Sequence, residues 1–300
     1  MARVRDPAVA GRFYEASPER LTASLRDCFL HQLGPGSLPR AAADGPGRIS
    51  ALVSPHAGYM FSGPAAANGF AALAADGIPE TVIILGPSHY SADRRAALSP
   101  ADSWRTPLGE VALDTDLAGA LLQSELIVAD ERPHRVEHSL EVQVPFLQFI
   151  YGERVPRICP ICIRSHPMLA LAQVIADARL VSQTIANAVG GRRAVIIAST
   201  DFSHQLPQAS AERLDRMALD AILALDPVGL LNVVVDHNIS MCGPVPVAIA
   251  LAYCIARGGR DAKLLRYYTS GDIIGERGAV VGYASVVTGM RIGAESDGKG

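Results

Sequence analysis

The chain has 300 residues, of which 49% are hydrophobic and 19% are charged, and its formal net charge is −3. This composition is typical of a globular protein and excludes a wholly disordered chain. The small net charge argues against a nucleic-acid-binding protein, which normally carries a strongly basic face. No apolar run approaches the roughly 20 residues of a transmembrane helix, so we expect no membrane partner.

The N-terminal segment lacks the apolar stretch of a secretory signal, and five cysteines are too few for a disulfide scaffold. We therefore expect a reduced, cytoplasmic protein. Cys159 and Cys162 form a C-x-x-C pair, but the apolar residues around them favour a buried strand over a redox or zinc site, which would need a second pair. Cys28 and Cys254 fall on apolar helical faces and are interpreted as core residues.

The first predicted helix follows Ser17, a plausible N-cap, with Pro18 in the first helical position. Its apolar residues keep helical spacing until Gly34, and a surface loop is expected over 34–48. Apolar runs and helical spacing then predict strands at 49–53, 81–85, 157–163, 194–198, 263–268 and 278–287, and helices at 64–75, 137–150, 168–189, 214–225 and 245–255.

Continuous apolar strands that alternate with helices are typical of a parallel sheet covered on both faces. The predicted fold class is therefore α/β, a single-domain three-layer αβα architecture with a mostly parallel central sheet. We expect one domain over residues 1–290. The polar segment 291–300 is expected to be a disordered tail.

Three of the predicted strands end in a tight turn that is followed by a histidine. These residues are His56, His89 and His204, and Asp201 precedes the last of them. In an open parallel sheet, ligands bind outside the carboxyl ends of the strands, so these side chains are expected to converge. Cys242 lies at the start of a predicted helix, where the dipole favours a metal-binding or nucleophilic thiolate; the alternative is a small core residue.

Two other catalytic patterns are weaker. His134 and His138 fit the H-x-x-E-H pattern of some zinc proteases, but Pro133 indicates that His134 begins a helix or lies in a loop. Ser88 and Ser203 each neighbour a histidine, yet the sequence has no G-x-S-x-G motif. Glycine-rich phosphate and dinucleotide motifs are also missing, so the use of ATP or of a dinucleotide is not indicated.

Seven segments of the chain form an ordered set of motifs: RDPAVAGRFY at 5–14, SPHAGY at 54–59, ILGPSH at 84–89, RTPLG at 105–109, EHSLEVQ at 137–143, STDFSH at 199–204 and CGP at 242–244. With these segments the chain resembles the Memo family, also called AmmeMemoRadiSam system protein B, between about residues 5 and 287. The family is related in fold to the LigB-like class III extradiol dioxygenases, which bind non-haem Fe(II) through two histidines and one carboxylate.

The resemblance implies that His56, His89 and Cys242 are metal ligands and that Asp201 and His204 line the same pocket. The third ligand would then be a thiolate, where the dioxygenases have a carboxylate. A thiolate favours copper or zinc alongside iron. We expect one divalent ion at this site, with Fe(II) as the first choice and Cu or Zn as alternatives.

Further roles follow from the same resemblance. His204 could act as a general acid or base, oriented by Asp201. His138 and Glu141 could be hydrogen-bond partners that fix the tautomer of a ligand histidine. Tyr59 follows His56 closely and could line the pocket or pack in the core.

Two functions remain open at this point. The first is a non-haem iron or copper oxidoreductase, dioxygenase-like, with open coordination positions at a His/His/Cys site. The alternative is a non-catalytic, metal-stabilised protein that kept the dioxygenase fold and binds a peptide or a small molecule. The family name implies a radical-SAM protein and an AMMECR-type protein as pathway partners.

Overall fold

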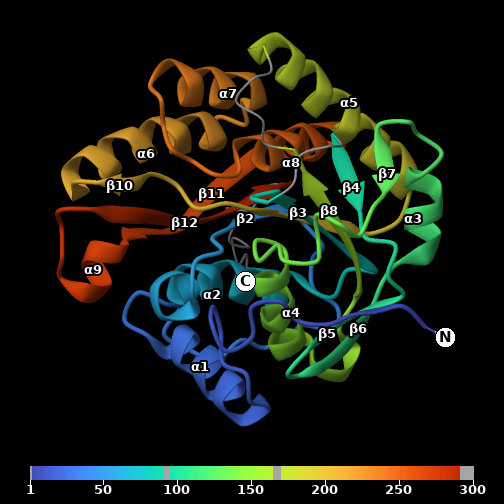
Figure 1. Cartoon of the computed structure of the whole chain (residues 1–300), viewed down its shortest axis with the longest axis horizontal. Helices are drawn as coiled ribbons and strands as arrows, with labels where there is room; N and C mark the ends of the chain where they lie inside the picture. Colours follow the sequence, from blue (N-terminus) through green and yellow to red (C-terminus); the bar gives the residue numbers. More distant parts are fainter. Residues whose placement is uncertain (1, 91–94, 165–169, 291–300) are drawn as a thin grey trace, which may run out of the picture.

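A computed structural model describes residues 2–90, 95–164 and 170–290. Its centre is a nine-stranded sheet in the order β10-β12-β2-β9-β3-β8-β4-β7, with β11 paired to β12 (Figure 1). The strands are β2 (Ile49–Ser54), β3 (Thr81–Pro87), β4 (Ala96–Leu98), β7 (Ile127–Ala129), β8 (Arg157–Ile163), β9 (Ala194–Ser199), β10 (His204–Leu206), β11 (Asp261–Thr269) and β12 (Val280–Gly289).

A second, three-stranded sheet has the order β1-β5-β6. Its strands are β1 (Val4–Arg5), β5 (Ser103–Thr106) and β6 (Gly109–Ala112). The helices are α1 (Pro18–Leu30), α2 (Tyr59–Asp76), α3 (Thr115–Leu121), α4 (Val144–Tyr151), α5 (Leu171–Val189), α6 (Gln208–Leu223), α7 (Pro227–Asp236), α8 (Pro244–Ala256) and α9 (Ser270–Ile274), with 3-10 turns η1 (Glu141–Gln143) and η2 (Gly152–Arg154).

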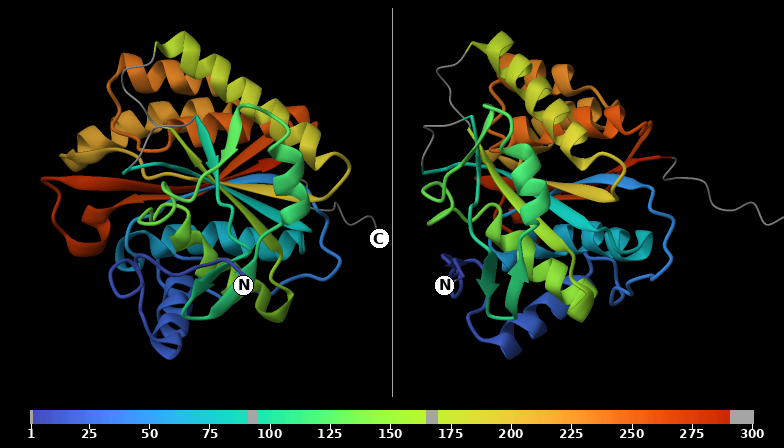
Figure 2. Two further views of the ribbon diagram at one scale, coloured as in Figure 1. Left: turned by 45° about the vertical axis from the view of Figure 1, so that its right-hand side comes forward. Right: turned by 90° about the vertical axis from the view of Figure 1, so that its right-hand side faces the viewer.

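Helices cover both faces of the large sheet (Figure 2). One face carries α5, α6, α7 and α8, and the other carries α1, α2 and α4. Successive residues of a strand point to opposite faces, so Val53 of β2 packs in the first core and Leu52 in the second. The predicted αβα architecture is confirmed.

The sheet is mixed: its four central strands are parallel, antiparallel pairs flank them on both sides, and the edge pair β4–β7 is parallel again. Strands β2, β9, β3 and β8 run parallel to one another. Strand β12 is antiparallel to β2, and β4 is antiparallel to β8. Cys159 and Cys162 lie on β8, buried and free, and pack on opposite faces of the sheet. No described helix is both long and apolar enough to cross a membrane.

The segment predicted as a helix at 137–150 is helical only from Glu141 onward. The carboxylate of Glu137 accepts the backbone N–H groups of His138 and Ser139, both at 2.9 Å. The backbone therefore bends around this side chain before any helix begins. The predicted tail at 291–300 lies outside the described residues.

Helix α2 begins at Tyr59 and continues through Pro64, although the sequence predicted a start at the proline. Proline removes one N–H from the helical hydrogen-bond ladder. The hydroxyl of Tyr268 enters the ladder at the next pair, because it donates to the carbonyl of Phe61 at 2.7 Å and accepts the N–H of Ala65 at 3.1 Å. A tyrosine from a distant strand thus satisfies the two backbone groups beside the proline.

We expect Tyr268→Phe to lower the free energy of unfolding by about 1–3 kcal/mol, because it leaves buried polar groups of the helix unpaired. Chemical denaturation measures this change. Tyr283→Phe is the control, since the Tyr283 ring packs 5.7 Å from that of Tyr268 and no hydrogen bond of its hydroxyl is among the described contacts. Equal losses in the two variants would contradict the bridging role.

Candidate metal centre

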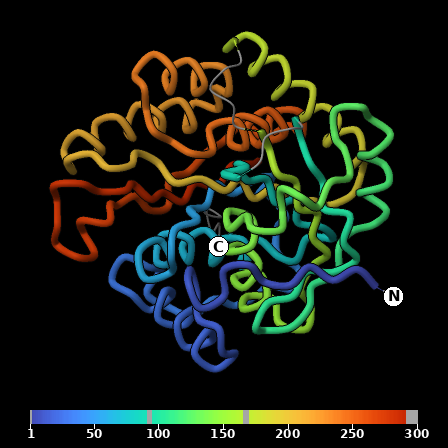
Figure 3. Tube along the Cα trace, in the orientation of Figure 1, coloured from blue at the N-terminus to red at the C-terminus, as the bar shows by residue number. Residues whose placement is uncertain are grey.

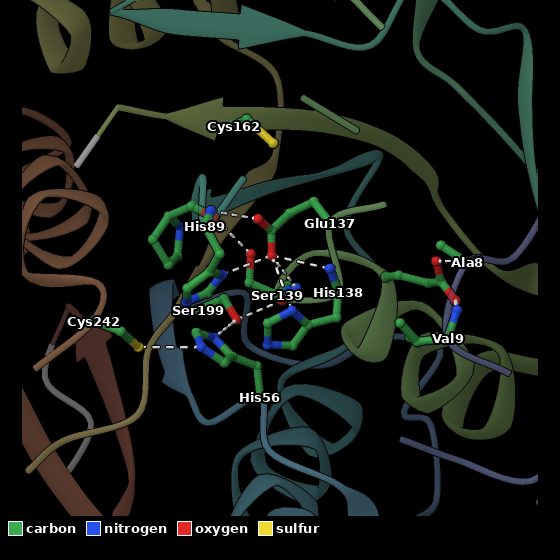
Figure 4. Close-up of polar contacts among 12 residues, drawn as sticks. Ala8, Val9, His56, His89, Glu137, His138, Ser139, Cys162, Ser199 and Cys242 are labelled. Carbon is green, nitrogen blue, oxygen red and sulfur yellow. Dashed lines mark hydrogen bonds and ion pairs between the residues drawn. The ribbon is translucent and has the colours of Figure 1, made fainter. Parts of the chain in front are cut away.

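Three potential ligands meet at the carboxyl ends of the central strands (Figure 4). His56 follows β2, His89 follows β3, and Cys242 directly precedes the glycine that caps α8. One ligand atom from each of these residues lies within 4.8 Å of the other two. The strand-end pattern had indicated His56 and His89 together with His204, and the resemblance had indicated the set with Cys242; the structure brings His56, His89 and Cys242 together, and His204 is not part of this group.

The tautomer of His56 is fixed by the hydroxyl of Ser199. That hydroxyl donates its one hydrogen to the carbonyl of Ser139 at 2.6 Å and accepts from Nε2 of Gln143 at 2.9 Å. It can therefore only accept from Nδ1 of His56, which lies 2.8 Å away. The lone pair of His56 is then on Nε2, 3.1 Å from the sulfur of Cys242.

His89 is fixed in the same way by Glu137. Oε1 of Glu137 lies 2.9 Å from Nδ1 of His89, and Oε2 accepts the backbone N–H of His89 at 2.6 Å. Burial alone would raise the pKa of Glu137, but hydrogen bonds from His138 and His89 outweigh it and hold the pKa well below its usual range. An ionised carboxylate can only accept, so Nδ1 of His89 carries the proton and Nε2 is left as a ligand atom.

A third imidazole, that of His138, stands beside the first two. Its ring centroid lies 5.3 Å from that of His56 and 4.7 Å from that of His89. The ring of Phe13 covers it at 4.4 Å. Burial lowers the pKa of His56, and charge on His138 or His89 would lower it further, so His56 is neutral and able to bind a cation.

The thiol of Cys242 lies between a hydrogen-bond acceptor, the imidazole of His56, and a donor, the backbone N–H of Asp201. It faces Nε2 of His56 at 3.1 Å, and the backbone N–H of Asp201 donates to the sulfur at 3.1 Å. Burial and the nearby charge of Asp201 raise the pKa of the Cys242 thiol well above its usual value. Without a cation the sulfur keeps its proton, and binding a metal ion there would release it.

Asp201 and His204 have different partners from those expected. The carboxylate of Asp201 accepts the backbone N–H of His56 at 2.8 Å and so fixes the loop that presents this histidine. His204 donates from Nδ1 to the carbonyl of Ser240 at 2.8 Å, so Nε2 is the ring nitrogen that remains for other partners. Among the described contacts no hydrogen bond joins Asp201 to His204, and Ser240 is the residue that binds both the backbone N–H and the ring of His204.

Glu141 is buried away from the imidazoles, in contrast to the expected role. It binds Nη1 of Arg5 at 2.7 Å, the hydroxyl of Tyr14 at 2.6 Å, and the backbone N–H groups of Ala8 and Val9 at 2.8 and 3.0 Å. The chain trace in Figure 3 shows the N-terminal segment running beside the segment that contains η1. Glu141 therefore anchors the N-terminal segment, and none of its described hydrogen bonds reaches a histidine.

Tyr59 also faces the core. Its hydroxyl donates to the carbonyl of Val142 at 2.6 Å, and its ring packs 4.9 Å from that of Phe146. Of the two roles considered for Tyr59, packing is the one that these contacts support.

His134 does not join the cluster, so the H-x-x-E-H pattern does not form a zinc site in the described chain. Its Nε2 donates to the carbonyl of Ala97 at 2.9 Å, and its Nδ1 lies 3.5 Å from the sulfur of Cys162. The physical reason is the bend at Glu137, which removes the helix that would have aligned His134 with His138.

Four partners of the site were missed by the sequence reasoning: Glu137, Gln143, Ser199 and Ser240. Three of them lie inside the segments EHSLEVQ and STDFSH, so the signal was the motif itself. Ser240 lies outside any motif, two residues before Cys242. Only the folded backbone shows that its carbonyl meets His204.

The fold and the ligand cluster define an αβα protein with a candidate metal centre at the carboxyl ends of its strands. The sequence profile of the family described as Memo-like protein matches residues 5–287. A MEMO1 family protein of Methanopyrus kandleri is 44% identical over 286 residues, covering 94% of this chain and 98% of that protein. One from Methanothermobacter thermautotrophicus is 42% identical over 284 residues, covering 94% and 99%. The chain therefore belongs to the Memo-like family.

A solved structure supports the fold. The crystal structure of an uncharacterized protein from Escherichia coli K12 superposes with a TM-score of 0.55 at 13% identity, covering 80% of this chain and 99% of that one. At this identity the likeness is one of architecture. It agrees with the layered α/β arrangement described above.

Buried His134 predicts a loss of stability in acid. Burial lowers its pKa from 6.5 to about 4, so the unfolded chain takes up a proton at a pH where the folded chain does not. As the pH is lowered from 6.5 to about 4, the free energy of unfolding should therefore fall, and His134 should account for about 3 kcal/mol of the decrease. Below about pH 4 His134 should cause no further decrease.

Denaturant titrations at pH 7 and pH 4 test this contribution. In His134→Gln the decrease between the two pH values should be smaller by about 3 kcal/mol than in the parent. His237→Gln serves as the control, because His237 is exposed. An unchanged decrease in His134→Gln would show that the imidazole is not held neutral.

Proposed function

We propose that this protein binds one divalent metal ion through His56, His89 and Cys242. Fe(II) is the first choice for this ion, and Cu and Zn are the alternatives. One observation carries the proposal. Both imidazoles have their Nδ1 proton bound to a fixed acceptor, which leaves the Nε2 lone pairs for a cation, and each imidazole offers one ligand atom within 4.8 Å of the sulfur. Donor groups of this kind, two imidazoles and a thiolate, suit iron, copper and zinc.

We propose further that the site belongs to a dioxygenase-like oxidoreductase. Three protein ligands leave coordination positions open, and an iron or copper ion bound there would supply one-electron chemistry. His204 is the proton-transfer group of this proposal: its Nδ1 is bound to Ser240, so Nε2 is the atom that takes up or releases a proton. Asp201 holds the His56 loop in place.

A non-catalytic binding protein is the second candidate. The thiol of Cys242 favours it, because it stands where related dioxygenases have a carboxylate. In that case the ion stabilises the pocket, and the pocket binds a small molecule or a peptide. Oxygen consumption by the metal-loaded protein, compared with that of Cys242→Ala, separates the two: turnover lost in the variant supports the enzyme, and no turnover in either supports the binding protein.

We propose the following cellular setting for the protein. The chain has a small net charge, and no described helix could span a membrane. These observations support a cytoplasmic protein without nucleic-acid or membrane partners. The family resemblance supports a radical-SAM protein and an AMMECR-type protein as pathway partners.

Elemental analysis after anaerobic purification tests the ligand set. We expect about one ion per chain in the parent and none in His56→Ala, which loses one of three ligands. Glu137→Gln should keep the site but weaken metal affinity about 10–100-fold, because the partner that fixes His89 loses its charge. Competition with a chromophoric chelator measures that affinity.

Matched variants outside the cluster control for general damage. His237→Ala removes an exposed histidine, and Glu110→Gln neutralises a partly exposed carboxylate paired with Arg105. Both should bind metal like the parent. Metal content that survives His56→Ala, or an apo parent that takes up no ion on reconstitution, would overturn the ligand assignment.

A further inference from the structure

A cavity of about 340 Å³ lies between the end of β8 and helices α5, α7 and α8. These helices lie together on one face of the sheet (Figure 2). The walls are mostly apolar side chains, among them Ile163, Val174, Val181, Leu231, Met241 and Ile249. Its volume falls in the range of small-molecule sites.

The cavity opens at the edge of the sheet where ligands bind in open α/β folds. Arg164 directly follows β8, and Met241 and Pro244 stand on either side of the Cys242–Gly243 pair. None of the candidate metal ligands lines the cavity. It is therefore a separate recess beside the candidate metal centre.

Two arginines, Arg95 and Arg164, lie among the apolar residues that line the cavity. The backbone N–H of Arg164 donates to the carbonyl of Arg95 at 3.0 Å, so the two residues are neighbours at adjoining strand ends. Asp177 is the acidic residue of the lining, and its carboxylate pairs with Nε of Arg95 at 3.2 Å. Nε of Arg164 is buried and has no hydrogen-bond partner among the described residues. The lining thus carries two cationic residues and one anionic residue.

We infer that this cavity binds an apolar monocarboxylate, with its alkyl or aryl body among the aliphatic walls and its carboxylate on Arg164. Arg95 is paired with Asp177, so Arg164 is the cationic residue of the lining whose charge no acidic residue of the lining balances, and this charge selects an anion. A planar guanidinium pairs with a carboxylate through two parallel hydrogen bonds. The aliphatic walls exclude small hydrophilic anions, which would gain nothing from burial there.

Calorimetric titration of the full-length protein with sodium octanoate tests the inference. We expect one octanoate per chain, and at least about tenfold weaker binding of 1-octanol, which has the same chain without the charge. Arg164→Gln should weaken octanoate binding about tenfold or more and bring it close to that of octanol. Val174→Trp should abolish binding of both, because the indole fills the cavity.

Arg213→Gln is the matched control, since Arg213 is an exposed arginine on α6 outside the cavity. It should bind octanoate like the parent. Failure of octanoate to bind, equal affinity for octanol, or unchanged binding in Arg164→Gln would each overturn the inference; if Val174→Trp does not fold, Arg164→Gln still decides. The titration is done with apo and metal-loaded protein, so its result is independent of the proposed metal function.

Discussion

One hydrogen-bond network holds both histidines of the candidate metal centre, and it starts at the buried carboxylate of Glu137. This carboxylate binds the imidazole and the backbone of His89, and it also accepts the N–H of Ser139. The carbonyl of Ser139 in turn receives the hydroxyl of Ser199, which accepts from His56. Two strand ends that are distant in sequence are thereby fixed relative to each other, with both Nε2 atoms left free to bind.

Close backbone approach makes this network possible, and glycines provide it. A Cβ at Gly86 would lie 2.6 Å from Oγ of Ser139, so a side chain there would push the Glu137 loop away from β3. A Cβ at Gly243 would lie 2.5 Å from the carbonyl oxygen of Ser199. The start of α8 can therefore pack against the end of β9, which brings Cys242 to the histidines. The segments ILGPSH and CGP thus need glycine at these positions because a larger residue would clash.

The sequence alone predicted the structural features that depend on the local pattern of apolar and polar residues. The central strands are apolar on both faces, so their runs identify them directly, and the residues after β2 and β3 meet because parallel strands end at one edge. It failed where a distant group changes local structure. Helix α2 continues through Pro64, where the hydroxyl of Tyr268 bridges the adjacent backbone pair, and the segment at 137–140 is no helix because the carboxylate of Glu137 binds its backbone N–H groups.

The motif EHSLEVQ shows most clearly what only the fold decides. Its two glutamates are four residues apart and chemically identical, yet Glu137 faces the imidazoles while Glu141 binds Arg5 and the N-terminal segment. Glu137 lies close enough to His89 and His138 to be considered a ligand itself. However, Oε1 already accepts three hydrogen bonds, from the imidazole of His89 and from two backbone N–H groups. A cation at Oε1 would have to displace these donors, and Oε2 is held by the backbone N–H of His89, whereas Cys242 needs only to lose a proton, which favours the thiolate as third ligand.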